Sequence, residues 1–343
     1  MEEQTPRIKR YVTVIGHSPD TVELRVGVWN PISHILNDDE SGGTLYKILS
    51  LLKGDRTLPE IAQKAGIPLS KIEDIVSQLA QLNVIEYSPE SGIDYYLNHA
   101  IPALQPRTDT IKKIKIIGSQ TLGNIIYGLL EQCNYFDSID ILSTTGYEQL
   151  QNSSRAQSWE KDSLAFEQLV SQYESWKGHY IVVASNQVDP LVMQAVNRIC
   201  FALDLPFFYT TIDGPFLFIG PTIVPGKSAC WECLETRVTM NLRNSASYLN
   251  YKNALTNGRV HSIDYYPERI IQHLLSTHAS MEILNYCLTG SSFTVNKVLS
   301  IYLPTMEIVF HEIFKVPSCK ACYPSRTSRI RESYYNLSTL LNT

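Results

Sequence analysis

Two Cys-x-x-Cys pairs limit what this chain can fold into more than any other feature of its sequence. Cys230 and Cys233 form the first pair, and Cys319 and Cys322 form the second. Each pair can present two thiolates to one ion, and two pairs complete a closed tetrahedral zinc site. Four thiolates leave no coordination position for water, so we expect a structural zinc ion and no zinc-dependent hydrolysis. A redox dithiol in either pair is the alternative interpretation.

Composition and the remaining cysteines narrow the class of protein. The seven cysteines are odd in number, and the sequence starts without the charged and apolar regions of a signal peptide. We therefore expect a cytoplasmic chain without disulfides. Hydrophobic residues make up 44% and charged residues 18% of the chain, which excludes wholesale disorder. No apolar stretch approaches the ~18 residues that suggest a membrane span. The net charge of −5 disfavours a basic surface that would bind nucleic acid.

The N-terminal quarter of the chain combines strand and helix patterns. Alternating apolar and polar residues predict strands over residues 11–15, 21–29 and 32–36, and a further short strand over residues 84–87. Apolar residues at helical spacing predict helices over residues 45–52, 57–65 and 70–82. Thr57 and Glu60 form a capping box at the start of the second helix. Three strands followed by three short helices indicate a winged-helix-like domain.

The rest of the chain alternates strands with helices. Apolar runs predict strands over residues 114–117, 139–142, 180–184 and 206–211, with helices over residues 121–132, 166–173 and 190–203 between them. This alternation indicates right-handed βαβ units in a Rossmann-like parallel sheet, and an antiparallel strand within residues 306–314 makes the sheet mixed. The fold class is α/β. We divide the chain into a winged-helix-like domain (7–90), a linker (91–112), an α/β domain with the zinc site (113–325) and a tail (326–343).

A glycine loop follows the first strand of the α/β domain. Gly118 and Gly123 match the outer glycines of a phosphate-binding fingerprint, but Gln120 replaces the middle glycine that lets the backbone approach the phosphates. The outer glycines alone satisfy the needs of a tight turn and of helix packing. We interpret the loop as a degenerate nucleotide site and expect no bound ATP. No Ser/His/Asp or Cys/His arrangement predicts a catalytic residue elsewhere.

The winged-helix-like domain suggests a choice between nucleic acid and peptide. Residues 7–90 hold more acidic than basic side chains, so phosphate contacts cannot support DNA affinity. The strand over residues 32–36 instead offers an edge beside an apolar helix, where an extended peptide can add a strand. The expected contact residues are Ile32, Ser33, His34, Ile35 and Leu36 on the strand, and Lys71, Ile72, Ile75, Gln78 and Leu79 on the helix. The alternative is an edge covered by the rest of the chain.

Several of these motifs resemble one family. Residues 220–226 (GPTIVPG), residues 229–234 (ACWECL), Arg237, the second cysteine pair and the strand order over residues 114–211 resemble ThiF-like, ubiquitin-activating-enzyme-like proteins. Residues 54–86 resemble a PqqD-like peptide-recognition element. The combination is similar to the leader-peptide-binding partners of YcaO cyclodehydratases, which act in the biosynthesis of thiazole- and oxazole-modified peptides, bacteriocins among them.

The resemblance also identifies what this chain lacks. Active members that adenylate their substrates are expected to carry a full glycine loop, a ribose-binding acid after the second strand and an aspartate after the third. Here Gln120 interrupts the loop, Leu142 stands where the ribose-binding acid would be, and Asn186 replaces the aspartate. Asn186 removes a negative charge that would help to hold Mg²⁺. The resemblance therefore implies a scaffold that has lost adenylation chemistry.

The expected function follows from the peptide edge and the resemblance together. The chain would bind the leader of a ribosomally made precursor peptide and present its core to a YcaO-type cyclodehydratase, which forms azolines from Cys, Ser and Thr. It would act as a non-adenylating subunit, as a homodimer or a heteromer with the enzyme, with no membrane or nucleic-acid partner. The alternatives are an active ATP-dependent peptide-adenylating enzyme and a winged-helix transcription regulator.

Overall fold

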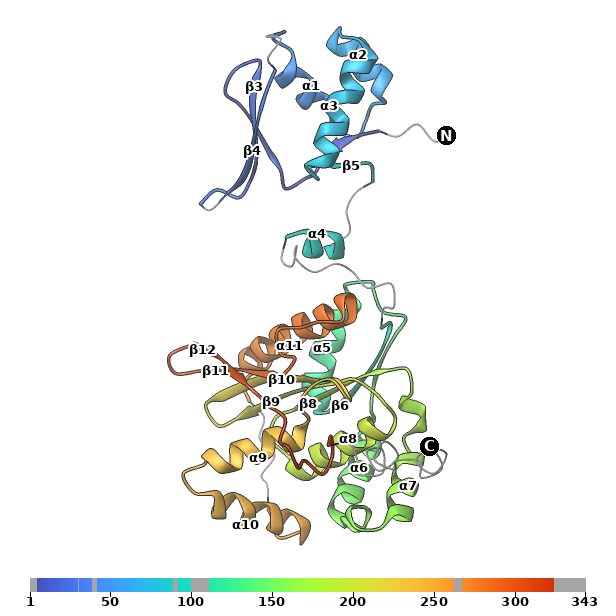
Figure 1. The fold of residues 1–343 in the computed structure, drawn as a ribbon, viewed down its shortest axis with the longest axis vertical. Coiled ribbons are helices and arrows are strands. Elements are labelled where there is room, and N and C mark those ends of the chain that lie inside the picture. The colour runs from blue at the N-terminus through green and yellow to red at the C-terminus, as the bar shows by residue number, and fades with distance from the viewer. Residues whose placement is uncertain are drawn as a thin grey trace, which may run out of the picture. The chain divides into compact units, whose positions relative to one another are not determined.

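The chain divides into two compact units, each with its own hydrophobic core. A computed structural model describes residues 5–29, 31–38, 42–88, 92–99, 111–261 and 267–323. The first unit covers Met1–Pro102 and the second covers Ala103–Thr343 (Figure 1). The predicted tail, residues 326–343, lies outside the described residues.

The first unit contains a three-stranded antiparallel sheet with three helices packed against it. The strand order is β2-β3-β4, and the short strands β1 and β5 pair separately. The strands are β1 (Arg7–Ile8), β2 (Thr13–Gly16), β3 (Thr21–Val26), β4 (Ile32–Asn37) and β5 (Ile85–Glu86), and the helices are α1 (Leu45–Leu51), α2 (Leu58–Ala65) and α3 (Leu69–Gln81). Val22 and Leu24 of β3 are buried in the core, as their alternation predicted.

Local sequence signals explain most helix boundaries in this unit. The Thr57 amide donates a hydrogen bond to Glu60 Oε2 at 2.9 Å, which confirms the predicted capping box of α2. Gly66 ends α2 in the left-handed conformation, with φ of 78°. Helix α3 begins after Pro68, slightly earlier than predicted, because proline suits the position before a helix.

The predicted linker contains a helix that the sequence analysis did not assign. Helix α4 (Gly92–His99) occupies part of residues 91–112. The Tyr95 ring meets the Tyr11 ring edge-to-face, with their centroids 5.2 Å apart. An aromatic pair of this kind stabilises the contact between α4 and the first unit. Helix α4 therefore contacts the first unit through this aromatic pair.

The second unit is built on a seven-stranded mixed sheet. The strand order is β12-β11-β10-β9-β8-β6-β7, and Figure 1 labels all of these except β7. The strands are β6 (Lys113–Gly118), β7 (Ser138–Ile141), β8 (Tyr180–Ser185), β9 (Phe207–Asp213), β10 (Phe216–Ile223), β11 (Lys297–Tyr302) and β12 (Glu307–Glu312). Strands β7, β6, β8 and β9 run parallel, and β9 to β12 pair antiparallel, so the mixed sheet is confirmed.

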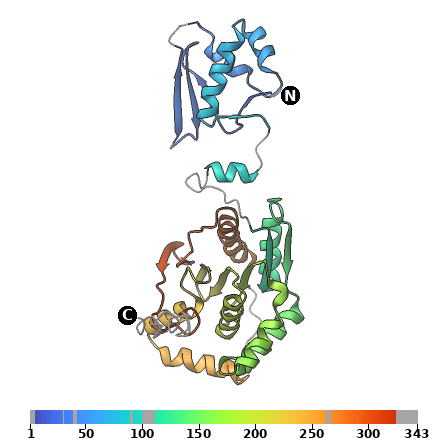
Figure 2. The same cartoon turned by 45° about the vertical axis from the view of Figure 1, so that its right-hand side comes forward.

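Helices cover both faces of this sheet. Helices α5 (Gln120–Glu131) and α11 (Arg269–Thr289) bury their side chains against one face. Helices α6 (Thr144–Ala156), α7 (Ser163–Ser171), α8 (Pro190–Ala202) and α9 (Trp231–Asn241) contribute to the core on the other face. Figures 1 and 2 both place α11 and α8 on opposite sides of the sheet. Helix α10 (Ser245–Thr256) contacts α6, α8 and α9.

Helices α6, α9, α10 and α11 were not predicted. Helices α6 and α10 are rich in Ser, Thr, Asn and Gln and show only a short apolar stripe. Helix α11 is buried along most of its length and buries Ser276, Glu282 and Asn285 along with its apolar residues. Polar residues on the buried face conceal the usual amphipathic pattern.

None of the helices within the described residues is long and apolar enough to cross a membrane.

Candidate functional site

Strand β4 forms one edge of the sheet in the first unit. It pairs with β3 along its whole length, with Ile32 opposite Val26 at one end and Asn37 opposite Thr21 at the other. Within the described residues no strand lies on its other side. The Asp38 amide donates to the Asp20 carbonyl at 2.9 Å, which continues this ladder. Main-chain groups of successive residues point to opposite sides of a strand. Ser33, Ile35 and Asn37 therefore direct their N–H and C=O groups to the open side.

Helix α3 lies next to the end of this strand. Lys71 Nζ donates a hydrogen bond to Asp38 Oδ2 at 3.3 Å, which joins the first turn of α3 to the residue after β4. Ile75 is partly buried and Gln78 is exposed, so both offer surface to a ligand. Ile72 and Leu79 have 0% and 1% exposure and belong to the hydrophobic core. The five predicted helix residues therefore divide into a surface row and a buried row that supports it.

Two of the four exposed residues of β4 are apolar, and the other two are Ser33 and Asn37. Ile32 is 67% and Ile35 63% exposed, on opposite faces of the strand, while His34 and Leu36 are partly buried. At the tip of the β3–β4 hairpin, Trp29 is fully exposed. The sequence predicted Trp29 as the last residue of a strand over residues 21–29, but β3 ends at Val26, which leaves Trp29 in the connection to β4. An open strand edge flanked by apolar side chains suits an extended peptide.

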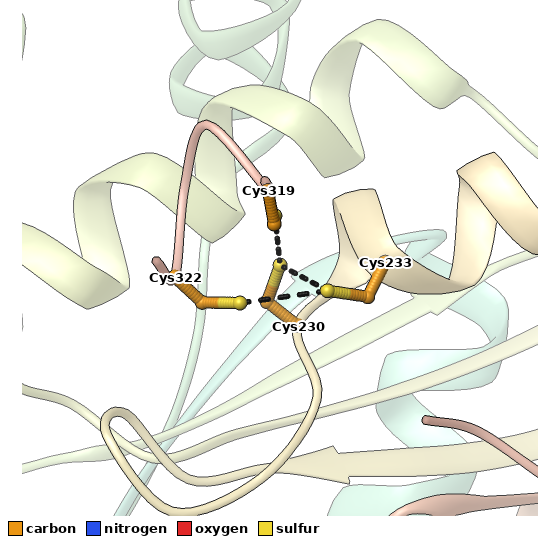
Figure 3. Close-up of side chains that lie close together, drawn as sticks. All are labelled: Cys230, Cys233, Cys319 and Cys322. Atoms are coloured by element: carbon orange, nitrogen blue, oxygen red, sulfur yellow. Dashed lines mark hydrogen bonds between the residues drawn. The ribbon is translucent and has the colours of Figure 1, made fainter. Parts of the chain in front are cut away.

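The four cysteines of the two pairs meet in the second unit (Figure 3). Cys230 and Cys233 lie at the start of α9, and Cys319 and Cys322 come from the last described segment. The Sγ atoms are 3.8 Å apart for Cys230–Cys233, 3.5 Å for Cys230–Cys319 and 3.4 Å for Cys233–Cys322. Four sulfurs about 2.3 Å from one tetrahedral ion would lie about 3.8 Å apart. The cluster could therefore hold a metal ion.

Hydrogen bonds link the cysteines to one another and to their surroundings. The Val316 amide donates to Cys233 Sγ at 3.3 Å, and hydrogen bonding between the two thiols lowers the pKa of Cys233 and raises the pKa of Cys230. Arg198 of α8 contacts both cysteine turns. Its Nη2 donates to Glu232 Oε2 at 3.1 Å and its Nη1 donates to the Lys320 carbonyl at 2.9 Å. Sequence reasoning missed Arg198 because it is distant from both pairs along the chain.

Packing accounts for both outer glycines of the degenerate loop. A Cβ atom on Gly118, where φ is 121°, would lie 2.2 Å from the Ala184 carbonyl oxygen on the neighbouring strand. A Cβ atom on Gly123 would touch Ile141 Cγ2 at 3.4 Å. Gln120 Nε2 donates to the Leu142 carbonyl at 2.7 Å, so its side chain bonds to the chain just after β7. All three residues therefore have structural roles in this fold.

A cavity of about 210 Å³ opens at the carboxyl ends of β6 and β8. Asn186 Nδ2 donates to Ser119 Oγ at 3.1 Å at the start of α5. Among the residues that line the cavity, Arg155 and Asp189 are the charged ones, and they pair at 3.7 Å. Asp189 also accepts from the Leu191 and Val192 amides at the start of α8. The described lining thus has neither excess positive charge for phosphates nor a carboxylate at the Asn186 position.

Known structures share this fold, although no protein-family model and no curated protein matches the chain. The heterocyclase TruD matches with a TM-score of 0.63 and 20% identity, over 95% of this chain and 44% of TruD. A heterocyclase in complex with substrate and cofactor matches equally well, with 18% identity over 95% of this chain and 40% of its own. E. coli MccB with AMPCPP and MccA matches with a TM-score of 0.53 and 15% identity, over 92% of this chain and 99% of MccB.

This chain has the fold shared by TruD and MccB. The likeness extends over both units, because it covers at least 92% of the chain in each case. The chain spans less than half the length of the two heterocyclase chains and nearly the whole of MccB. At these identities the likeness concerns the fold alone. The predicted mixed α/β architecture agrees with these structural neighbours.

Proposed function

We propose that this chain binds the leader of a ribosomally made precursor peptide and presents its core to a YcaO-type cyclodehydratase. The observation that carries the proposal is the open edge of β4, where Ser33, Ile35 and Asn37 direct main-chain groups outward beside α3. A leader segment would add a fourth strand there and pack against Ile75 and Gln78. Solved structures with this fold support a peptide ligand, since MccB is seen with MccA and a heterocyclase with its substrate.

The chemistry would take place on another polypeptide or another part of a longer one. The chain matches 44% of TruD, so the remaining part of that heterocyclase has no counterpart here. The cyclodehydratase would form azolines from Cys, Ser or Thr of the core. This chain would accelerate the reaction by raising the local concentration of the substrate and fixing its orientation. This chain would supply binding energy for the substrate, and the cyclodehydratase would supply the catalytic residues.

The cysteine cluster would hold a structural zinc ion. A closed set of four thiolates suits zinc and leaves no position for a substrate or a water molecule. The ion would join the start of α9 to the segment after β12, and Arg198 would hold the two cysteine turns together from α8. Its role would be to maintain the fold of the second unit.

A charged substitution on α3 tests the peptide site. We expect Ile75→Glu to weaken binding of a leader peptide about 20-fold or more, because the carboxylate would lose water against an apolar peptide side chain. Ser77→Glu adds the same charge on the exposed opposite face of α3 and should change the affinity by about twofold or less. The probe is a fluorescein-labelled synthetic leader of a candidate precursor peptide, and fluorescence anisotropy measures the dissociation constant.

Two outcomes would contradict the assignment of this site. Equal binding by wild type and Ile75→Glu would place the peptide elsewhere on the chain. No binding of the leader to the wild-type chain would remove the proposed function itself. A thermal melt of each variant shows whether the first unit remains folded.

An ATP-dependent peptide-adenylating enzyme is the second candidate. Two observations favour it. MccB, which shares the fold, has been solved with AMPCPP, and this chain has a cavity at the carboxyl ends of β6 and β8. We nevertheless expect no ATP–pyrophosphate exchange above background with the leader or the full precursor. Asn186 cannot supply the carboxylate that would help to hold Mg²⁺, and Arg155 is already paired with Asp189. Exchange that depends on the precursor would establish the adenylating function instead.

A further inference from the structure

Strand β12 is an unprotected edge of the large sheet. It pairs with β11 through six consecutive residues without a bulge, and all six of its side chains are exposed. Within the described part of the second unit, no strand lies on its other side (Figure 1). Its sequence, EIVFHE, contains no proline or lysine, which are the residues that commonly protect edges from pairing. An edge of this length and composition is a template for another strand.

The main-chain groups that β12 offers can be assigned residue by residue. The Ile313 amide donates to the Asn296 carbonyl at 2.7 Å, continuing the ladder with β11. Because main-chain groups alternate along a strand, the odd-numbered residues of β12 bond to β11. Ile308, Phe310 and Glu312 therefore direct their N–H and C=O groups outward.

Apolar side chains accompany this open edge. Ile308 and Phe310 lie opposite the buried residues Ile301 and Leu299 of β11, so all four share one face of the sheet. Ile308 is nevertheless 53% and Phe310 49% exposed, and Val309 on the other face is 38% exposed. A strand that pairs with β12 would bury part of this apolar surface.

We infer that β12 pairs antiparallel with β12 of a second copy of this chain. The even-numbered residues of β12 direct their N–H and C=O groups outward, so they must form the hydrogen-bonded pairs between the two copies. Only registers that place an even-numbered residue of one copy opposite an even-numbered residue of the other allow this. One of these registers places Val309 opposite Val309. It sets Ile308 opposite Phe310, and Glu307 opposite His311, on both sides of the two-fold axis.

The side chains favour this register over its neighbours. Both Ile308–Phe310 pairs are apolar, and both Glu307–His311 pairs join an acid to an imidazole. A shift of two residues in one direction sets Ile308 opposite Glu312, and a shift in the other sets Glu307 opposite Val309. Each alternative places a carboxylate against an apolar side chain. The strand is therefore complementary to itself in one register, and the dimer would join two seven-stranded sheets across a two-fold axis.

Cysteine cross-linking tests the register. The Val309 pair is a non-hydrogen-bonded pair, with Cα atoms about 4.5 Å apart, which a disulfide can span. We expect Val309→Cys to form a covalent dimer under mild oxidation on a non-reducing gel. His311→Cys is the matched control, because the two copies of residue 311 would lie about 14 Å apart along the strands. The wild-type chain, with its seven native cysteines, gives the background.

A lysine on the edge tests the interface in solution. Ile308→Lys should convert a wild-type dimer into a monomer, with the mass measured by light scattering after size-exclusion chromatography. Either a wild-type monomer at high concentration or a Val309→Cys chain that does not cross-link would overturn the inference. A dimer that survives Ile308→Lys would do so as well. Cross-linking of Val309→Cys decides the question if Ile308→Lys fails to fold.

Discussion

Replacing Cys233 with serine is expected to abolish binding of the proposed zinc ion and to lower the melting temperature of the second unit by about 10 °C or more. Cys233 is fully buried, its Sγ lies 3.4 Å from Cys322 Sγ, and it accepts a hydrogen bond from the Val316 amide. The metal would connect the start of α9 to the segment after β12, which are separated by more than eighty residues of chain. Loss of one ligand opens that connection, and the binding free energy of the ion no longer stabilises the fold.

Metal analysis and calorimetry check this result. The purified wild-type chain should contain one equivalent of zinc, and Cys233→Ser should contain much less. Cys133→Ser is the control, because this partly buried thiol lies outside the cluster and bonds to the Leu129 carbonyl in the last turn of the preceding helix, α5. Full metal content in Cys233→Ser, or the same melting temperature, would show that the cluster is not a structural metal site.

Replacing Ile35 with proline should weaken leader binding about a hundredfold. Proline removes the N–H group that Ile35 directs to the open side of β4 and leaves an acceptor of the peptide without a partner. A lost hydrogen bond plus an unpaired acceptor costs about 2.7 kcal/mol, which is a hundredfold in affinity. The ladder with β3 keeps its bonds, because the even-numbered residues of β4 make them.

Ile35→Ser is the matched control for this prediction. It keeps the N–H group and removes only a side chain that is 63% exposed, on the face of β4 that does not pack against the helices. Because this side chain flanks the open edge, its loss should weaken binding of the labelled leader about fivefold, far less than loss of the N–H group. Similar affinities for Ile35→Pro and wild type would mean that the peptide does not pair with the main chain of β4. Circular dichroism of both variants verifies that the first unit is folded.

Short-range patterns predicted much of the fold. The alternation of Val22 and Leu24 placed β3, and the Thr57–Glu60 box placed the start of α2, because each signal depends on neighbours a few residues apart. Helix α11 escaped prediction for the opposite reason. Its buried Glu282 accepts hydrogen bonds from the Thr294 amide and hydroxyl, which lie in the loop between α11 and β11. A polar residue that finds its partner only in the tertiary structure looks like a surface residue in the sequence.

The candidate sites divide in the same way. The sequence named all four cysteines of the cluster, since the spacing within each pair already reflects the geometry of one ion. It did not find Arg198, whose two partners lie in separate cysteine turns. It also grouped Ile72 and Leu79 with Ile75, because periodicity identifies an apolar stripe without showing which of its residues the core takes up.

The sequence alone predicted the mixed α/β architecture and the four cysteines that could hold a metal ion, because local spacing and residue chemistry encode both of them. The tertiary structure decided which edges stay open, and β4 and β12 are edges only because the sheet order places no strand beyond them among the described residues. It also decided which polar groups are already paired, as Arg155 is with Asp189. These properties depend on contacts between distant residues, and such contacts form only when the chain is folded.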